Sequence, residues 1–117
     1  MIAETLQKIV ENTPGAQGAI LMDAEGIPVD QFLTDDAADV ETIAMELSAR
    51  VIELRKAARS LELGAIGDIS IKTERATVIV RFLGADMYVV LVLSPNGNPG
   101  KGRWKLRSST HQLLELL

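Results

Sequence analysis

The chain has 117 residues, of which 47% are hydrophobic and only 3% aromatic, and its formal net charge is −4. This size suits one domain with an aliphatic core, and the acidic balance argues against a nucleic-acid binder, which needs a basic surface. Without cysteine and with a single histidine, the chain cannot build a disulfide, a thiolate nucleophile or a Cys- or His-rich metal site. We see no signal peptide and no apolar run long enough to span a membrane, so we expect a cytoplasmic protein.

The first third of the chain predicts one helix and one hairpin. Residues 2–12 repeat apolar side chains at helical spacing and end in the helix-stopping sequence NTPG. Residues 18–23 and 27–33 are apolar runs joined by AEG, which is typical of a β-hairpin. Pro28 cannot donate a ladder hydrogen bond, so the second strand is expected at an edge of the sheet, or to begin at Pro28.

Residues 36–61 predict the longest helix, around which the rest of the chain is organised. Asp36 supplies an N-cap, with Asp39 in an acidic first turn, and neither Gly nor Pro interrupts the segment. One stripe about 120° wide carries its apolar residues: Val40, Ile43, Ala44, Leu47, Val51, Leu54, Ala58 and Leu61. At roughly 39 Å, the helix is longer than so small a domain needs to cover its own sheet.

A second side of this helix carries little charge where a solvated face should be polar. It consists of Met45, Ser48, Ala49 and Ile52. Small residues permit close helix approach and Met suits adaptable contacts, so we predict a dimer or partner surface; scattered exposed apolar residues are the alternative. Acidic residues occupy the first half of the helix and basic residues the second. Either the helix dipole or an antiparallel pair of identical helices explains this segregation, and the two are compatible.

The remaining segments complete the order αββαβββα. Residues 66–73 alternate as a strand with one wet face, whereas 77–83 and 87–93 are continuously apolar, as central strands are. Residues 94–102 predict a loop and 103–117 a final helix. We therefore predict a single α+β domain over the whole chain: a five-stranded antiparallel sheet with the long central helix on one face and the two terminal helices on the other.

One basic cluster lies at the start of the final helix, beside Trp104. Its members are Lys101, Arg103, Lys105 and Arg107. Cations at a helix start oppose the dipole, so they are not there for helix stability. We interpret the cluster as a solvated face with Trp104 packed against the sheet; a patch for an acidic partner, a phosphate-bearing ligand or a membrane surface is the alternative.

No catalytic, cofactor or metal site is predicted. Residues 97–102 lack the first Gly and the Ser/Thr of a phosphate-binding P-loop. Ser108 and His111 stand three apart on a helix, but neither an oxyanion site nor a nucleophile turn accompanies them. A surface histidine is the expected role of His111.

Three stretches, taken in order, resemble the Roadblock/dynein light chain family. Residues 18–29 (GAILMDAEGIPV) resemble its first hairpin, 88–93 (YVVLVL) its last strand, and 98–106 (NPGKGRWKL) the start of its closing helix. The chain is most similar to the bacterial MglB type within that family. It departs from the family pattern at Lys101 and Gly102, where apolar residues are usual, so a later or looser closing helix is expected.

The resemblance implies a profilin/longin-like fold and a homodimer or heterodimer. In such dimers two sheets join edge to edge and the two long helices lie side by side. It assigns residues 66–73 to the joining edge, with Ile69 and Ile71 at the interface. It also implies that the protein binds a small GTPase or acts as an adaptor, without an active site of its own.

The sequence therefore predicts a non-catalytic homodimer that regulates a small Ras-like GTPase by binding one of its nucleotide states. A structural adaptor or scaffold subunit, without effect on GTP hydrolysis or exchange, is the alternative. No nucleic-acid partner, cofactor or integral membrane segment is expected.

Overall fold

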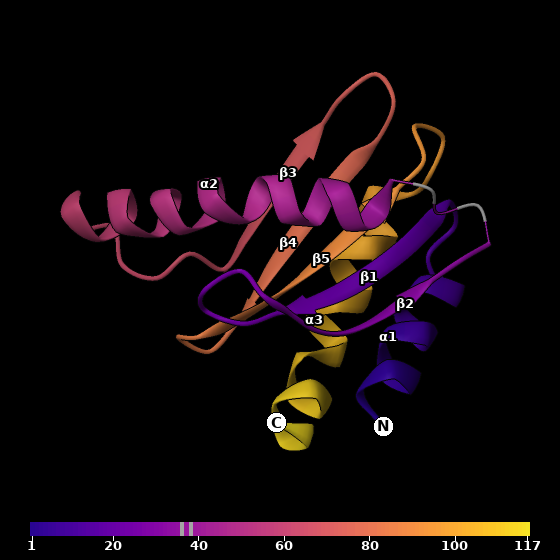
Figure 1. The fold of residues 1–117 in the computed structure, drawn as a ribbon, viewed down its shortest axis with the longest axis horizontal. Coiled ribbons are helices and arrows are strands. Elements are labelled where there is room, and N and C mark those ends of the chain that lie inside the picture. Colours follow the sequence, from indigo (N-terminus) through magenta and orange to yellow (C-terminus); the bar gives the residue numbers. More distant parts are fainter. Residues whose placement is uncertain (36, 38) are drawn as a thin grey trace.

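A five-stranded antiparallel sheet separates two helical layers in the computed structural model, which describes residues 1–35, 37 and 39–117 (Figure 1). In chain order the elements are α1 (Ile2–Glu11), β1 (Ala16–Met22), β2 (Pro28–Leu33), α2 (Val40–Ser60), β3 (Asp68–Lys72), β4 (Thr77–Leu83), β5 (Met87–Leu93) and α3 (Pro99–Leu116). The predicted α+β class and element order are confirmed.

The strand order across the sheet is β2-β1-β5-β4-β3, so β2 and β3 form its two edges. Each neighbouring pair is antiparallel. Pro28 is the first residue of the edge strand β2, where a missing N–H costs little, as the sequence predicted. The central strands β4 and β5 are buried along nearly their whole length, because helices cover both faces of the sheet.

Each face of the sheet supports its own hydrophobic core. On one face α2 contributes Val40, Ala44 and Val51, which pack with the inward residues of β1, β4 and β5. On the other face α1 contributes Leu6 and Ile9, and α3 contributes Leu106 and Leu113. The predicted division, with the long helix on one side and the terminal helices on the other, is confirmed.

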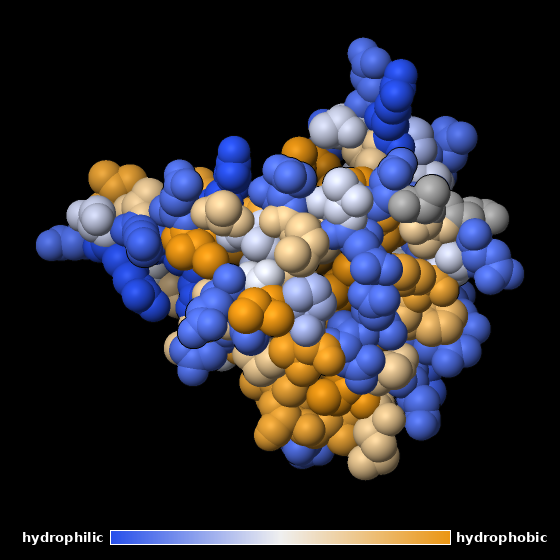
Figure 2. All heavy atoms as spheres, in the orientation of Figure 1, coloured by the Kyte–Doolittle hydropathy of each residue, from blue (hydrophilic) through white to orange (hydrophobic). Residues whose placement is uncertain are grey.

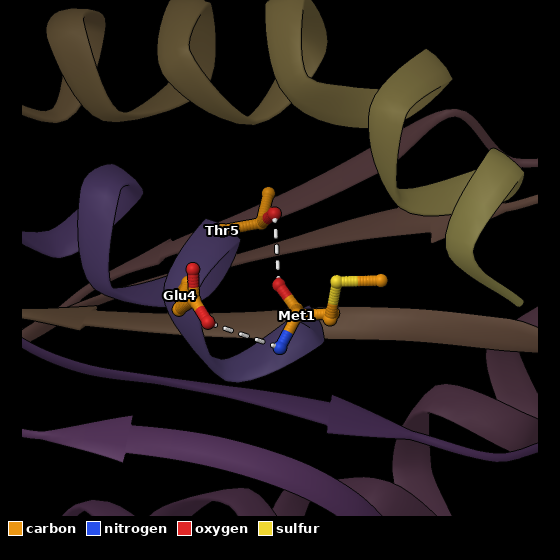
Figure 3. A network of polar contacts seen from close by, with 3 residues as sticks. All are labelled: Met1, Glu4 and Thr5. Atoms are coloured by element: carbon orange, nitrogen blue, oxygen red, sulfur yellow. Dashed lines mark hydrogen bonds and ion pairs between the residues drawn. The ribbon is translucent and has the colours of Figure 1, made fainter.

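The first turn of α1 is held by local polar contacts (Figure 3). The amino nitrogen of Met1 lies 3.5 Å from Oε1 of Glu4, and the Thr5 hydroxyl donates to the carbonyl oxygen of Met1 at 3.3 Å. The same Met1 carbonyl oxygen also accepts from the Thr5 backbone N–H at 3.2 Å, so these contacts add to the first helical hydrogen bond.

The helix α2 is shorter at its start than predicted. It begins at Val40 after Asp39, whose side chain makes no capping hydrogen bond. The predicted cap Asp36 lies outside the described residues. At the other end, the apolar stripe continues past the sheet, where Leu54 is 47% exposed and Leu61 68% exposed. The last turns of α2 project beyond the strands (Figure 1).

The closing helix α3 begins earlier than predicted, at Pro99 instead of residue 103. The Asn98 side chain accepts a hydrogen bond from the Lys101 backbone N–H at 3.0 Å, and proline suits the first helical position. Gly102 is buried, and a Cβ there would lie 3.1 Å from Cδ2 of Leu91. The prediction of a later or looser helix is therefore wrong, because Gly102 lets α3 lie close against the sheet.

Among the helices of the described chain, none combines the length and apolarity that a membrane crossing requires.

Candidate interaction surface

The outer edge of β3 lies open beside an apolar groove. Only β4 pairs with β3 among the described strands, so the backbone groups along its other side have no strand partner. A hollow of about 310 Å³ follows this edge, and its walls include Ile43 and Leu47 of α2 and Ile71 of β3. Unpaired edges and exposed apolar surface are both features that proteins bury in interfaces.

A second hollow, of about 290 Å³, continues this apolar surface at the C-terminal end of α2. Leu54 of α2 and Leu61, which follows the helix, line it together with Leu63 and Ile66 of the segment leading into β3. Leu63 is 73% exposed, an unusual position for leucine on a small domain. Apolar side chains are visible on both sides of α2 between hydrophilic ones (Figure 2).

The two hollows lie along one flank of α2. Ile43, Leu47, Leu54 and Leu61 are spaced by four or seven residues, which keeps them in one line along a helix. We call this line, together with Ile66 and Ile71, the β3-side seam. Helical periodicity assigned all four to the core; Ile43 and Leu47 do pack against it, half-buried. Leu54 and Leu61 are exposed at the end of the helix.

The predicted patch of Met45, Ser48, Ala49 and Ile52 lies on the opposite flank, next to the β1–β2 turn. Ser48 is only 6% exposed and its hydroxyl donates to the Ala44 carbonyl oxygen at 2.7 Å. Met45 and Ala49 are exposed and Ile52 is half-buried, so these three form the accessible part of the patch. The structure therefore does not bring this patch together with Ile69 and Ile71, which are half-buried on the β3 side.

Asp23 shapes the β1–β2 turn, and Gly26 brings that turn into contact with Ser48 of α2. The Asp23 carboxylate accepts hydrogen bonds from the backbone N–H groups of Glu25 at 2.9 Å and Ile27 at 3.0 Å, as Asx-turns do. Gly26 has a φ of +81°, a conformation that favours glycine. This contact buries Ser48 and explains the Asp and Gly of the hairpin motif.

Tyr88 of β5 lies beneath this turn and is fully buried. Among the described residues its hydroxyl has no hydrogen-bond partner; the Ser48 hydroxyl is near, but donates to its own helix. Burial raises the pKa of Tyr88 above the usual 10.0; the charge of Asp23 also raises it, and the charge of Arg55 lowers it. The ring packs at a tilt against Phe82, with centroids 5.7 Å apart.

The basic cluster of α3 surrounds an exposed tryptophan. Trp104 is 60% exposed, so the expectation that it packs against the sheet is wrong. Lys105 Nζ lies 5.9 Å from the centroid of the indole ring. Arg103 donates to the Ser70 hydroxyl at 3.4 Å, which places the Arg103 flank of α3 toward β3. At about 100° per residue, Lys101 and Lys105 lie on the other flank.

The hydroxyl and imidazole groups of α3 do not form a nucleophile. The Ser108 hydroxyl donates to the Lys105 carbonyl oxygen at 3.2 Å, while His111 Nε2 lies 2.9 Å from the Glu115 carboxylate. Both side chains of that pair are exposed. Within residues 1–35, 37 and 39–117, no group of three or more His, Asp or Glu side chains is arranged to hold a metal.

Comparison with known proteins places this fold in one family. The Roadblock/LC7 domain model matches residues 2–94. MglC from Myxococcus xanthus is 31% identical, with a TM-score of 0.73 and 100% of each chain covered. No curated protein sequence matches.

Two further structures share the fold at lower identity. The gliding protein MglB from Thermus thermophilus is 20% identical, with a TM-score of 0.84, over 97% of this chain and 86% of that one. MglB from Myxococcus xanthus is 12% identical, with a TM-score of 0.85, over 98% and 93% of the two chains. The family match over most of the chain and the identity to MglC show that this chain belongs to the Roadblock/LC7 domain family.

Proposed function

We propose that this protein forms a homodimer through β3 and the β3-side seam, and that the dimer regulates a small Ras-like GTPase. The observation that carries the proposal is the open edge of β3 beside two apolar hollows, together with the exposed side chains of Leu54, Leu61 and Leu63. A monomer would leave both features in water, where they favour aggregation. A second copy would cover both at once.

Two-fold symmetry relates the parts of such a dimer in a simple way. Antiparallel pairing of two β3 strands places the symmetry axis perpendicular to the joined sheet. Both α2 helices then lie on the same face, side by side and antiparallel. This arrangement sets the acidic first half of each α2 beside the basic second half of the other, so the charge pattern favours the pairing.

The partner surface in this proposal is the outer side of the paired α2 helices. Met45, Ala49 and Ile52 remain accessible there after the seam is covered. Binding the GTPase in only one nucleotide state would shift its conformational equilibrium without any catalytic group from this chain. Family membership supports this regulatory role.

Two measurements test the proposal. Light scattering should give a mass of about twice 12.7 kDa; a related MglB has a tetrameric arrangement, so four copies are a further outcome compatible with seam pairing. A stable monomer would contradict the proposed mechanism. Pull-down of small Ras-like GTPases from the same organism, loaded with GDP or with a non-hydrolysable GTP analogue, should show a preference for one nucleotide.

The structural adaptor is the second candidate. Exposed leucines at the end of α2 would serve a scaffold contact equally well. Binding of a GTPase without any change in hydrolysis or exchange rate would favour the adaptor. A change in either rate would favour the regulator.

A further inference from the structure

We propose that the outer face of α3 docks on an anionic lipid bilayer, with Trp104 at the centre of the contact. The face, named here the α3 ridge, consists of Trp104 and the four surrounding cations Lys101, Arg103, Lys105 and Arg107. It lies on the opposite side of the sheet from α2. The inference stands on residues of a single chain and does not require the proposed dimer or its GTPase.

The geometry of α3 places the tryptophan outward with charge on both sides. Gly102, Leu106 and Leu113 are the buried residues of the helix, and Trp104 projects roughly opposite them at about 100° per residue. The Lys101 and Lys105 pair lies on one side of Trp104. The Arg103 and Arg107 pair lies on the other.

The positive charge of the ridge is not neutralised within the protein. None of the four cations lies within ion-pair distance of a carboxylate among the described residues. The first turn of α3 contains no acidic residue, so Lys101 and its neighbours oppose the helix dipole without compensation. Four of the chain's 12 basic residues thus gather on one helix of a protein with net charge −4.

The exposed indole adds a second, independent feature. Trp104 is the single tryptophan of the chain and is 60% exposed, although burying an aromatic ring is strongly favourable. Tryptophan flanked by Lys and Arg is typical of surfaces that lie in the headgroup region of a membrane. The long cationic side chains can reach lipid phosphates while the ring enters the interface.

The shape of the surface favours a bilayer over an acidic peptide. A helix that packs on a sheet presents a convex ridge, whereas peptides usually bind in a groove or along a strand edge. A ridge can approach a flat lipid surface along its whole length. The neighbouring α1 exposes Glu4, Lys8 and Glu11, so on these two helices the excess of positive charge lies on α3.

Trp104 fluorescence and vesicle co-sedimentation test the inference on the whole chain. Vesicles containing about 30% phosphatidylserine should bind the protein and shift the Trp104 emission to the blue. Vesicles of phosphatidylcholine alone should neither bind the protein nor shift the Trp104 emission. Raising the salt from about 0.1 M to about 0.5 M should weaken binding several-fold, because the contact is largely electrostatic.

Matched variants locate the contact. The double variants Lys101→Glu/Lys105→Glu and Arg103→Glu/Arg107→Glu should each lower vesicle partitioning by about ten-fold or more. Trp104→Ala should lower it by about three-fold or more. The control Lys8→Glu/Arg75→Glu reverses the charge of two exposed cations outside the ridge and should change little. Circular dichroism on every variant separates lost binding from lost folding.

Three results would overturn the inference. One is that the folded wild-type protein does not bind phosphatidylserine vesicles at low salt. Another is an equal loss of binding in the control variant, which would show that no local surface is involved. The third is binding of a poly-glutamate peptide without vesicle binding, which would assign the ridge to an acidic protein segment. Failure of dimerisation or GTPase binding would leave these measurements unaffected.

Discussion

Gly26 and Ser48 are in direct contact where the β1–β2 turn meets α2, and a Cβ at position 26 would lie 2.8 Å from the Cβ of Ser48. The Tyr88 hydroxyl lies at the same point, 3.6 Å from that Cβ position. Three elements therefore meet at a residue without a side chain. The contact fixes the turn against the long helix and closes the core above Tyr88.

Replacing Gly26 by Ala should destabilise the fold. The variant carries the strain of a positive φ, about 1–2 kcal/mol, and also the clash with Ser48, which adds about 1–3 kcal/mol. Gly64→Ala is the matched control, because Gly64 has a φ of +86° but no atom within 4 Å of an added Cβ. Denaturant unfolding should show the larger loss for Gly26→Ala. Equal losses of unfolding free energy in the two variants would mean that the turn moves away from Ser48 and relieves the clash.

Replacing Tyr88 by Phe should leave stability unchanged or raise it by about 1 kcal/mol. The Tyr88 hydroxyl is buried without a hydrogen-bond partner in the part of the chain that the structure describes, and an unsatisfied buried polar group is costly. Phenylalanine keeps the ring contact with Phe82. Urea unfolding at neutral pH measures the difference. A loss above about 1 kcal/mol would reveal a hydrogen bond that the Tyr88 hydroxyl makes in solution.

The raised pKa of Tyr88 predicts a loss of stability in alkali. Burial raises the pKa in the folded state above 10.0, so the folded chain holds this proton more tightly than the unfolded chain does. The free energy of folding that this tighter proton binding contributes is fully present below about pH 10. It is lost as the pH rises from there toward the folded-state pKa. The Tyr88→Phe variant has no hydroxyl to ionise at this position, so its stability relative to wild type should increase above about pH 10. A constant difference across that range would contradict the prediction.

Charge on the two flanks of α2 should have different effects. Leu54 is 47% exposed on the β3-side seam, so Leu54→Glu should leave a folded monomer and weaken dimerisation by about ten-fold or more. Ala49→Glu lies on the outer side and should weaken GTPase binding while the dimer remains. Light scattering and pull-down of both variants compare the two surfaces. If either variant dimerises and binds the GTPase as strongly as wild type, the substituted residue does not belong to an interface.

Loss of the α3 cap should cost a modest amount of stability. The Asn98 side chain accepts from the Lys101 backbone N–H at 3.0 Å, and replacing such a cap by Ala costs about 1 kcal/mol. Asn96 lies in the same loop and is exposed, so Asn96→Ala is the control and should cost less than about 0.5 kcal/mol. Thermal unfolding of both variants measures the difference. Equal effects would show that the cap does not stabilise α3.

Local sequence patterns determined the elements of this protein and their order. Helical periodicity placed α2, alternation and apolar runs placed the strands, and Pro28 identified an edge strand, because each of these signals depends on residues near one another in the chain. The start of α3 was missed although Asn98 and Pro99 signal it, because the glycines around Lys101 suggested a loop. The family resemblance rested on such local motifs and was confirmed.

Only the tertiary structure decided which apolar residues are surface. Leu47, Leu54 and Leu61 share the periodicity of the core. Leu47 packs against that core, but the sheet ends before the helix does, so Leu54 and Leu61 are 47% and 68% exposed. The sequence pattern placed Ser48 on the surface. In the structure the turn that contains Gly26, far away in the chain, covers Ser48. Trp104 was expected against the sheet and points away from it. Burial depends on which elements meet in space, and the spacing of residues along one element does not contain that information.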